Sequence, residues 1–326
     1  MNIPDLSVEI AGICLKNPVI AASGTFGYGE EFRQLIDLSQ LGGFVVKGLS
    51  IEPMKGAAAP RLHETASGML NAIGLQNVGA EQFVKEKLPR LRRFGTLIFA
   101  NVFGYSTQDY VRVVEVLNKA DGLAGYEINI SCPNVKRGGL VYGTDPAATY
   151  EVVSAVKAAA RLPVIVKLSP NVTDISVIAR AAEHAGADAL SLINTLIGMS
   201  IDIETQRSRL GNLTGGLSGP AIKPVALRMV YETVRAVTIP VIGIGGIRTA
   251  ADALEFLMVG AKAVEVGTAN FLDPEATIEI IKGLREFCTR KGIEKLNSIV
   301  GTVRVEADKT GHAEKPRKTD HCRSGC

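Results

Sequence analysis

Short apolar runs rich in β-branched residues recur along the chain, and each ends at a small or polar residue before a longer segment with helical periodicity. Such runs are typical of strands that are buried on both faces of a parallel sheet. The pattern predicts eight strands, at Pro18–Ala22, Gly43–Lys47, Leu97–Asn101, Tyr126–Ile130, Val164–Leu168, Ala189–Ile193, Val241–Ile244 and Ala263–Val266. Because eight parallel strands with right-handed crossovers close without an edge strand, the predicted fold class is α/β, a (β/α)8 TIM barrel. A doubly wound open sheet is the competing arrangement.

Two further patterns predict how the barrel floor is closed and where helices begin. The alternating runs Val8–Ile10 and Ile13–Leu15 flank Ala11–Gly12 and predict an N-terminal hairpin that closes the floor. Asp145–Pro146 and Asp273–Pro274 each place an N-capping Asp before a Pro at the first helical position. We therefore expect a helix to begin at each of these prolines.

Three connections are unusually long. The segments from Gly48 to about Leu97 and from Asn194 to about Val241 exceed one helix, and Cys132 to Gly143 forms a third long loop. Insertions that follow barrel strands lie over the C-terminal mouth, where enzymes of this fold place their chemistry. We therefore predict long loops over that mouth.

The chain divides into a large folded part and a short tail. Residues 1–305 are predicted to form the barrel domain, whereas no Val, Ile, Leu or Phe occurs after Val305, so residues 306–326 are predicted to be a disordered tail. The N-terminal residues lack a basic stretch followed by an apolar one, and no apolar run reaches about 18 residues. We therefore expect neither a signal peptide nor a membrane span, and a cytoplasmic location.

Composition and charge narrow the functional classes. Aromatic residues make up 5% of the chain and Trp is absent, so the core must be mainly aliphatic. The net charge is only +3, and no basic run punctuated by aromatic residues precedes the tail, which disfavours nucleic acid and favours a small substrate. The five cysteines include no Cys-x-x-Cys pair, so no metal or iron–sulfur site is expected in this chain.

The residues that follow the predicted strands are polar or glycine and would all face one mouth. A polar residue at any one of these positions can be explained by a solvated loop, but two lysines and three asparagines together favour a ligand-binding or catalytic site. The set comprises Ser23, Lys47, Asn101, Asn129, Cys132, Lys167, Asn194, Thr195, Gly245, Gly246, Gly267 and Thr268.

Glycines and lysines in this set indicate an anionic ligand. Gly245–Gly246 and Gly267–Thr268 follow the last two strands, where backbone N–H groups can approach a phosphate closely, although glycines after strands are often only turn formers. The spacing is not Gly-x-Gly-x-x-Gly, so no dinucleotide fingerprint is present.

Lys47 and Lys167 have three possible roles: a Schiff-base nucleophile, a fixed positive charge for an anionic ligand, or a solvated surface side chain. Their position at the ends of strands disfavours only the surface role. A lysine near N1 of reduced flavin would stabilise its negative charge.

Cys132 begins the loop over the mouth, in the sequence Asn129-Ile-Ser-Cys-Pro-Asn134. A lone Cys is usually an inert buried residue, whereas a thiol near lysines can be partly thiolate and act as a base or nucleophile. None of the four histidines stands in a neighbouring motif, which favours a base over a Cys–His nucleophile.

The eight-strand order, the motif at 129–134, the motif Asn71-Ala-Ile-Gly-Leu-Gln-Asn77, and Asn194–Thr195 with Gly211–Gly219 resemble the class 1 dihydroorotate dehydrogenases, over about Ile3 to Val305. The resemblance implies an FMN-containing barrel that oxidises dihydroorotate to orotate in pyrimidine biosynthesis. It implies that Cys132 removes the C5 proton while the C6 hydride passes to flavin N5. A base and an electron acceptor would then act on the same substrate.

The resemblance also assigns binding residues. Those implied for dihydroorotate are Lys47, Asn71, Ala72, Ile73, Gly74, Leu75, Asn129, Asn194 and Thr195, with Lys47 and the amides meeting the carboxylate and the polar ring groups. Those implied for FMN are Ser23, Lys47, Gly48, Asn101, Asn129, Lys167, Ile193, Gly219, Gly245, Gly246, Gly267 and Thr268, the last four around its phosphate.

Within class 1, the segments Asn194–Asp202 and Leu213–Gly219 look more like the NAD-linked subclass than the fumarate-linked one. NAD reduction through FAD and an iron–sulfur cluster needs a dinucleotide fold and clustered cysteines, and this sequence supplies neither. The resemblance therefore implies an electron-transfer partner subunit that carries FAD and the cluster, and a homodimer core within a heterotetramer. The alternatives are a fumarate-linked class 1A enzyme, a dihydropyrimidine dehydrogenase-type flavin oxidoreductase, and a flavin-free lyase or isomerase with Lys167 as Schiff base.

Overall fold

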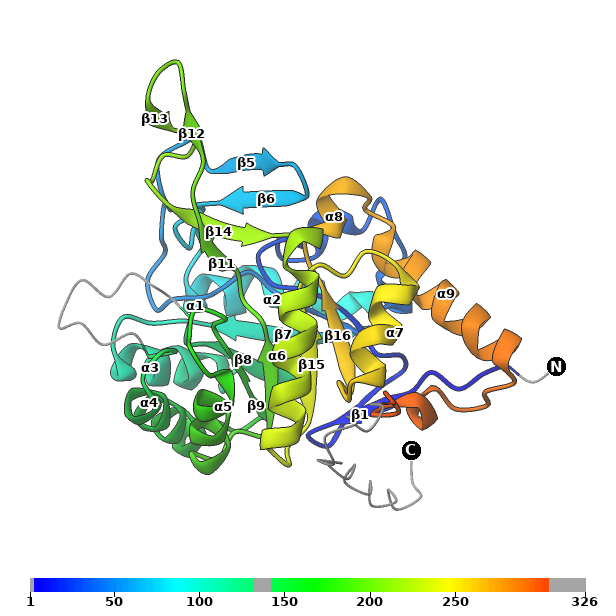
Figure 1. Ribbon diagram of the computed structural model, residues 1–326. Helices are drawn as coiled ribbons and strands as arrows, with labels where there is room; N and C mark the ends of the chain where they lie inside the picture. The colour runs from blue at the N-terminus through cyan, green and yellow to red at the C-terminus, as the bar shows by residue number, and fades with distance from the viewer. Residues whose placement is uncertain (1–2, 132–141, 305–326) are drawn as a thin grey trace.

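The computed structural model describes residues 3–131 and 142–304, and within them parallel strands close into a barrel (Figure 1). The order around the barrel is β10-β15-β16-β3-β4-β7-β8-β9. These strands are β3 (Val19–Ala21), β4 (Gly43–Val45), β7 (Leu97–Val102), β8 (Gly125–Asn129), β9 (Val164–Lys167), β10 (Ala189–Leu192), β15 (Val241–Ile244) and β16 (Ala263–Val266). Each overlaps one predicted run, and closure confirms the (β/α)8 barrel over the open sheet.

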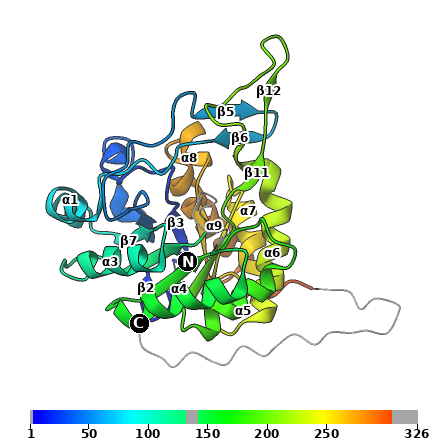
Figure 2. The same cartoon turned by 90° about the vertical axis from the view of Figure 1, so that its left-hand side faces the viewer.

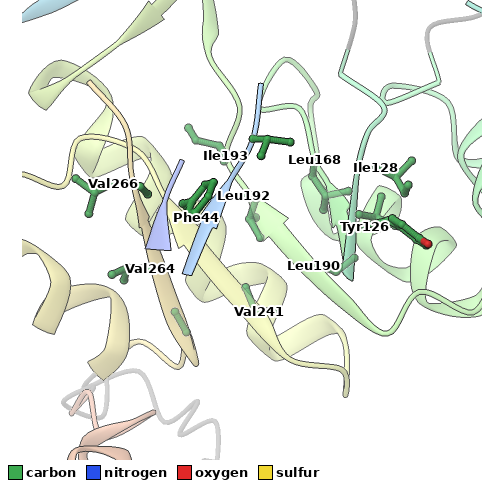
Figure 3. Packing of buried hydrophobic residues seen from close by; sticks show 14 of the residues in the cluster. Phe44, Tyr126, Ile128, Leu168, Leu190, Leu192, Ile193, Val241, Val264 and Val266 are labelled. Carbon is green, nitrogen blue, oxygen red and sulfur yellow. The ribbon is translucent and has the colours of Figure 1, made fainter. Parts of the chain in front are cut away.

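Side chains along the barrel strands alternate between the surrounding helices and the barrel interior. Phe44, Tyr126, Leu190 and Val264 belong to the main core (Figure 3). The same core also contains side chains of the helices around the barrel. The inward positions nearest the floor are apolar: Ile20, Val45, Phe99, Ile165, Ala189, Ile242 and Ala263. The next inward positions toward the mouth are polar and buried: Asn101, Glu127, Lys167, Ser191 and Glu265. The interior therefore changes from apolar at the floor to polar at the mouth.

The predicted N-terminal hairpin closes the floor. Strands β1 (Val8–Ile10) and β2 (Ile13–Leu15) pair antiparallel, and Val8, Ile10 and Leu15 pack in one cluster with the inward floor residues. Three apolar side chains thus seal the lower end of the barrel from solvent, which confirms this prediction.

The helices surround the barrel (Figures 1 and 2). They are α1 (Ala80–Gln82), a π-helical turn at Phe83–Lys87, α2 (Leu88–Leu91), α3 (Thr107–Leu117), α4 (Pro146–Ala159), α5 (Ile175–His184), α6 (Lys223–Ala236), α7 (Ala250–Met258), α8 (Ala269–Leu272) and α9 (Ala276–Lys291). Short 3₁₀ segments lie at Glu30–Phe32, Leu38–Gln40, Arg92–Phe94, Pro220–Ile222 and Leu296–Ile299.

Two expectations about helices need correction. The connection from β3 to β4 contains only the 3₁₀ segments at 30–32 and 38–40, and Gly29 before the first has a left-handed φ of 92° that no α-helix contains. Asp145 caps α4 as predicted, but α9 begins at Ala276 instead of Pro274. Asp273 accepts a hydrogen bond from the Glu275 amide at 2.9 Å, so it stabilises the turn that precedes the helix.

The two long insertions form a second sheet over the mouth. Its order is β11-β14-β6-β5, with β5 (Leu62–Thr65) and β6 (Gly68–Asn71) from the first insertion and β11 (Leu196–Gly198) and β14 (Gly215–Ser218) from the second. In Figure 1 this sheet lies above the barrel strands, and the hairpin of β12 (Ile201–Asp202) and β13 (Arg207–Ser208) projects beyond it. The predicted position of both insertions is confirmed.

Parts of the predicted organisation lie outside the described residues. Residues 305–326, which include the predicted tail, and residues 132–141, which include Cys132 and most of the third loop, are among them. Within the described residues, no helix has the length and apolar character needed to cross a bilayer.

Packing between α7 and β15 gives a test of the barrel core. Phe256 is fully buried, and a Cβ added to Gly243 would lie only 2.4 Å from its ring. We expect Phe256→Ala to lower the free energy of unfolding by about 3–5 kcal/mol, because it leaves a cavity that the barrel cannot refill. Phe271→Ala, which truncates a ring that is 50% exposed, is the matched control in equilibrium urea unfolding. Equal losses in both variants would contradict the packing described.

Candidate active site

A cavity of about 950 Å³ lies at the C-terminal ends of the barrel strands, beneath the β11-β14-β6-β5 sheet. All of the predicted binding residues line it, although they come from segments more than 200 residues apart. They are Ser23, Lys47, Gly48, Asn71, Ala72, Ile73, Gly74, Leu75, Asn101, Asn129, Lys167, Ile193, Asn194, Thr195, Gly219, Gly245, Gly246, Gly267 and Thr268. Cys132 is outside the described residues, but Ser131 before it lines the same cavity.

One side of the cavity is a cradle of glycine backbone after β15 and β16. Gly246 has φ 74°, and an added Cβ would lie 2.7 Å from the Lys223 Cβ and 2.9 Å from the Gly219 carbonyl oxygen. Next to it, the Thr268 hydroxyl donates to Ser218 Oγ at 2.8 Å. Gly245, Gly246 and Gly267 all line the cavity and carry no side chain, which suits close approach of a phosphate group to the backbone.

The floor of the cavity holds a buried cation. Lys167 Nζ lies 3.3 Å from Glu127 Oε1 and 3.3 Å from Glu265 Oε2. Burial alone would lower the pKa of Lys167, but its interactions with Glu127 and Glu265 outweigh burial and raise this pKa. Lys167 is therefore a fixed positive charge, held from below by two carboxyl groups and facing the cavity.

Lys47 presents a second cation of a different kind. It follows β4, lines the cavity and is only partly buried. Among the described residues its ammonium has no hydrogen-bonded or ion-paired partner, in contrast to Lys167. Burial and then the charge of Arg61 lower the pKa of Lys47. The charge of Glu31 opposes this shift without pairing with the ammonium. An anionic ligand would supply the direct partner that Lys47 lacks among the described residues.

Amide side chains are arranged above the floor. Asn194 Nδ2 donates to Asn129 Oδ1 at 3.3 Å, and the Ser131 backbone N–H donates to the same oxygen at 3.2 Å. Asn71 Nδ2 donates to the Gly216 carbonyl at 3.0 Å, which fixes it between β6 and β14. These groups place donors and acceptors around one volume, as recognition of a small polar ring requires.

Several residues of the site were not singled out from the sequence. Asn171 and Ser169 line the cavity, and Asn171 Nδ2 donates to the Thr195 carbonyl at 3.0 Å. Glu127 and Glu265 hold Lys167, and Asn101 Nδ2 donates to Glu127 Oε1 at 2.6 Å. Glu127 and Glu265 could have been noticed in the sequence, because each lies inside an otherwise apolar strand and a buried charge needs a partner.

A sequence model of a family described as dihydroorotate dehydrogenase matches residues 5–288. The chain belongs to the dihydroorotate dehydrogenase family. Its matched span contains every residue that lines the cavity.

Individual members of the dihydroorotate dehydrogenase family match over nearly their whole length. A Geotalea uraniireducens protein named dihydroorotate dehydrogenase B (NAD(+)), catalytic subunit, is 57% identical over 93% of this chain and 99% of its own. A Geobacter sulfurreducens protein of the same name is 57% identical over 94% and 100%. A Solibacter usitatus protein, provisionally named dihydroorotate dehydrogenase A (fumarate), is 59% identical over 92% and 99%.

The glycine cradle of this dihydroorotate dehydrogenase family member gives a second prediction. Gly246→Ala adds a methyl group to a crowded position with a left-handed φ, whereas Gly292→Ala adds one at φ 65° with nothing within 4 Å. We expect Gly292→Ala to cost about 1 kcal/mol and Gly246→Ala about 1–3 kcal/mol more, because overpacking adds to the backbone strain. Equilibrium unfolding checks this, and equal costs would contradict the crowding at Gly246.

Proposed function

We propose that this chain is the FMN-dependent catalytic subunit of an NAD-linked dihydroorotate dehydrogenase, which oxidises dihydroorotate to orotate in pyrimidine biosynthesis. The observation that carries the proposal is one cavity that joins a bare glycine cradle, the fixed Lys167 cation and the unpartnered Lys47 cation. A phosphate-bearing flavin and a substrate carboxylate need these features at different points of one site. The printed names of the relatives support the reaction.

The residues present fit FMN. The cradle of Gly245, Gly246, Gly267 and Thr268 would hold the phosphate, and Lys167 would stabilise negative charge on the ring. The other residues proposed for FMN are Ser23, Lys47, Gly48, Asn101, Asn129, Ile193 and Gly219. When bound, FMN supplies the acceptor for the substrate hydride.

The substrate residues form the remaining wall. We assign Lys47 to the dihydroorotate carboxylate, because this ammonium has no carboxylate partner among the described residues. The residues from Asn71 to Leu75, with Asn129, Asn194 and Thr195, would bind the ring polar groups. Cys132 would take the C5 proton, and Ser131 brings the chain to the cavity immediately before it.

Electrons would then pass to NAD⁺ through a partner subunit with FAD and an iron–sulfur cluster. Two relatives are named catalytic subunits, a term that implies a further subunit. The name of the Solibacter usitatus relative keeps fumarate as the alternative acceptor. The heterotetramer with a homodimer core and the cytoplasmic location stay predictions.

One physical argument disfavours a flavin-free Schiff-base enzyme. A nucleophilic lysine must lose its proton, and burial against an apolar wall promotes that loss. Lys167 instead lies between two glutamates that raise its pKa. A protonated ammonium cannot attack a carbonyl carbon.

An anaerobic visible spectrum of the purified chain tests the function. We expect a flavin band that bleaches on addition of dihydroorotate and not of dihydrouracil. Bleaching by dihydrouracil would indicate a dihydropyrimidine dehydrogenase-type enzyme, and an active chain without flavin would contradict the proposal. Reoxidation of the bleached chain by fumarate, without a partner, would assign the fumarate-linked type.

Cys132→Ser tests the proposed base. The variant is expected to bind FMN and orotate normally but to slow flavin reduction by dihydroorotate by about 10²-fold or more at neutral pH, because an alcohol is a poorer base than a thiol. Anaerobic stopped-flow spectra measure this rate. A rate equal to that of the unmodified chain would remove Cys132 from the mechanism.

Lys47→Met tests carboxylate recognition. We expect orotate affinity to fall about tenfold or more, because a charge-assisted hydrogen bond of about 1.5–3 kcal/mol is lost, while the weak binding of uracil changes little. Perturbation of the flavin spectrum by each ligand gives both affinities. Equal binding of orotate and uracil by the unmodified chain would contradict the substrate assignment.

A further inference from the structure

Two buried glutamates lie below the Lys167 ammonium. Glu127, Lys167 and Glu265 are the charged side chains that are buried in the described part of the chain, with 1%, 5% and 2% of their surface exposed. Both carboxyl groups approach the same ammonium: Lys167 Nζ lies 3.3 Å from Glu127 Oε1 and 3.3 Å from Glu265 Oε2. Two carboxylates around one ammonium would leave one buried negative charge uncompensated, which is costly, so this arrangement favours protonation of one of them.

The surroundings identify the protonated group. Glu127 accepts hydrogen bonds from Asn101 Nδ2 at 2.6 Å and from Ser191 Oγ at 2.9 Å, in addition to its contact with Lys167. Among the described residues, the hydrogen-bonding partner of the Glu265 carboxyl group is Lys167. Donors stabilise an anion, so the negative charge belongs on Glu127 and the proton on Glu265.

The directions of the pKa shifts agree with this assignment. Burial and then the negative charge of Glu127 raise the pKa of Glu265 well above its ordinary value. Burial would also raise the pKa of Glu127, but the charge of Lys167 and the hydrogen bonds outweigh it, and this pKa is lowered. Lys47, a second lysine that lines the cavity, is not among the groups that shift the pKa of either glutamate.

Filling the barrel does not require this cluster. The same strands supply apolar side chains one layer below, and a buried ion pair contributes little net stability compared with apolar residues of similar volume. Of the three charged side chains in the cluster, Lys167 lines the cavity, whereas Glu127 and Glu265 do not. Its effect on a ligand is therefore transmitted through the lysine ammonium.

We propose that Glu265 holds a proton and Glu127 holds the anion throughout flavin reduction, so that both act as positioning residues for the Lys167 cation. This inference rests on the proposed flavin function. One cation, one anion and one neutral acid leave the cluster without net charge. A second carboxylate would make it negative and would oppose the addition of electrons to a flavin in the cavity.

Conservative variants of the flavin-loaded chain test the charge assignment through the flavin midpoint potential. Glu265→Gln keeps the shape and the neutral charge, so we expect the potential to equal that of the unmodified chain from about pH 6 to about pH 8. The double variant Glu127→Gln/Glu265→Gln removes the anion, so its potential is expected to shift to a more positive value. A positive shift in Glu265→Gln, whether smaller than or equal to that of the double variant, would show that Glu265 is ionised. An unshifted potential in both variants would also overturn the proposal.

Infrared spectroscopy of the unmodified chain supplies a readout that depends on neither activity nor a variant that folds. We expect the carbonyl stretch of a protonated carboxyl group to persist as the pH rises from about 5 to about 8, and to be lost in Glu265→Gln. A flavin-loaded chain without this band would contradict the inference. A chain that shows the band but never holds flavin would instead contradict the proposed function, so the two failures are distinguishable.

Discussion

The interaction between Lys167 and two buried glutamates is the constraint on which the upper half of the barrel depends. A charged ammonium inside a protein is costly unless it is paired and hydrogen-bonded, so the strands around it must supply the partners. They come from β8 and β16, with Asn101 of β7 and Ser191 of β10 supporting Glu127. A single cation thus links five strands and fixes the polar floor on which the cavity rests.

Other parts of the molecule keep water away from the lower side of this polar floor and leave its upper side open to a ligand in the cavity. The N-terminal hairpin and the apolar inward layer exclude water from the lower barrel. The sheet built from both insertions roofs the mouth, and Asn71 ties β6 to β14 across 145 residues of sequence. Between floor and roof, the Lys167 cation is paired with two carboxyl groups, whereas Lys47 has no directly paired carboxylate among the described residues. Lys167 is therefore suited to adjusting the charge around a bound ligand, whereas Lys47 is suited to pairing with an anionic group of the ligand.

Much of the fold could be predicted because its signals are local. A strand buried on both faces has a recognisable apolar run, and the run at Val164–Leu168 differs from the observed β9 by one residue. The start of α9 was wrong because Asp–Pro is compatible with both a helix N-terminus and a turn, and only the observed hydrogen bond to the Glu275 amide distinguishes them. The pairing of β6 with β14 could not be predicted, since no local pattern specifies a partner so distant in sequence.

Site residues that follow a strand could be predicted from the sequence, whereas those that lie within a strand could not be predicted as easily. Lys47 and Lys167 were found by position, but their different charge states follow from neighbours that only the tertiary structure brings together. Glu127 and Glu265 are 138 positions apart, and their approach to one ammonium depends on β8 and β16 facing each other across the closed barrel.

A crystal structure of the chain loaded with flavin and orotate would test most directly whether this cavity is one composite site. The account predicts the flavin phosphate in the cradle at Gly246 and Thr268, the flavin ring next to the Lys167 ammonium, and the orotate carboxylate at Lys47. A flavin bound elsewhere, or an orotate carboxylate that does not contact Lys47, would contradict it.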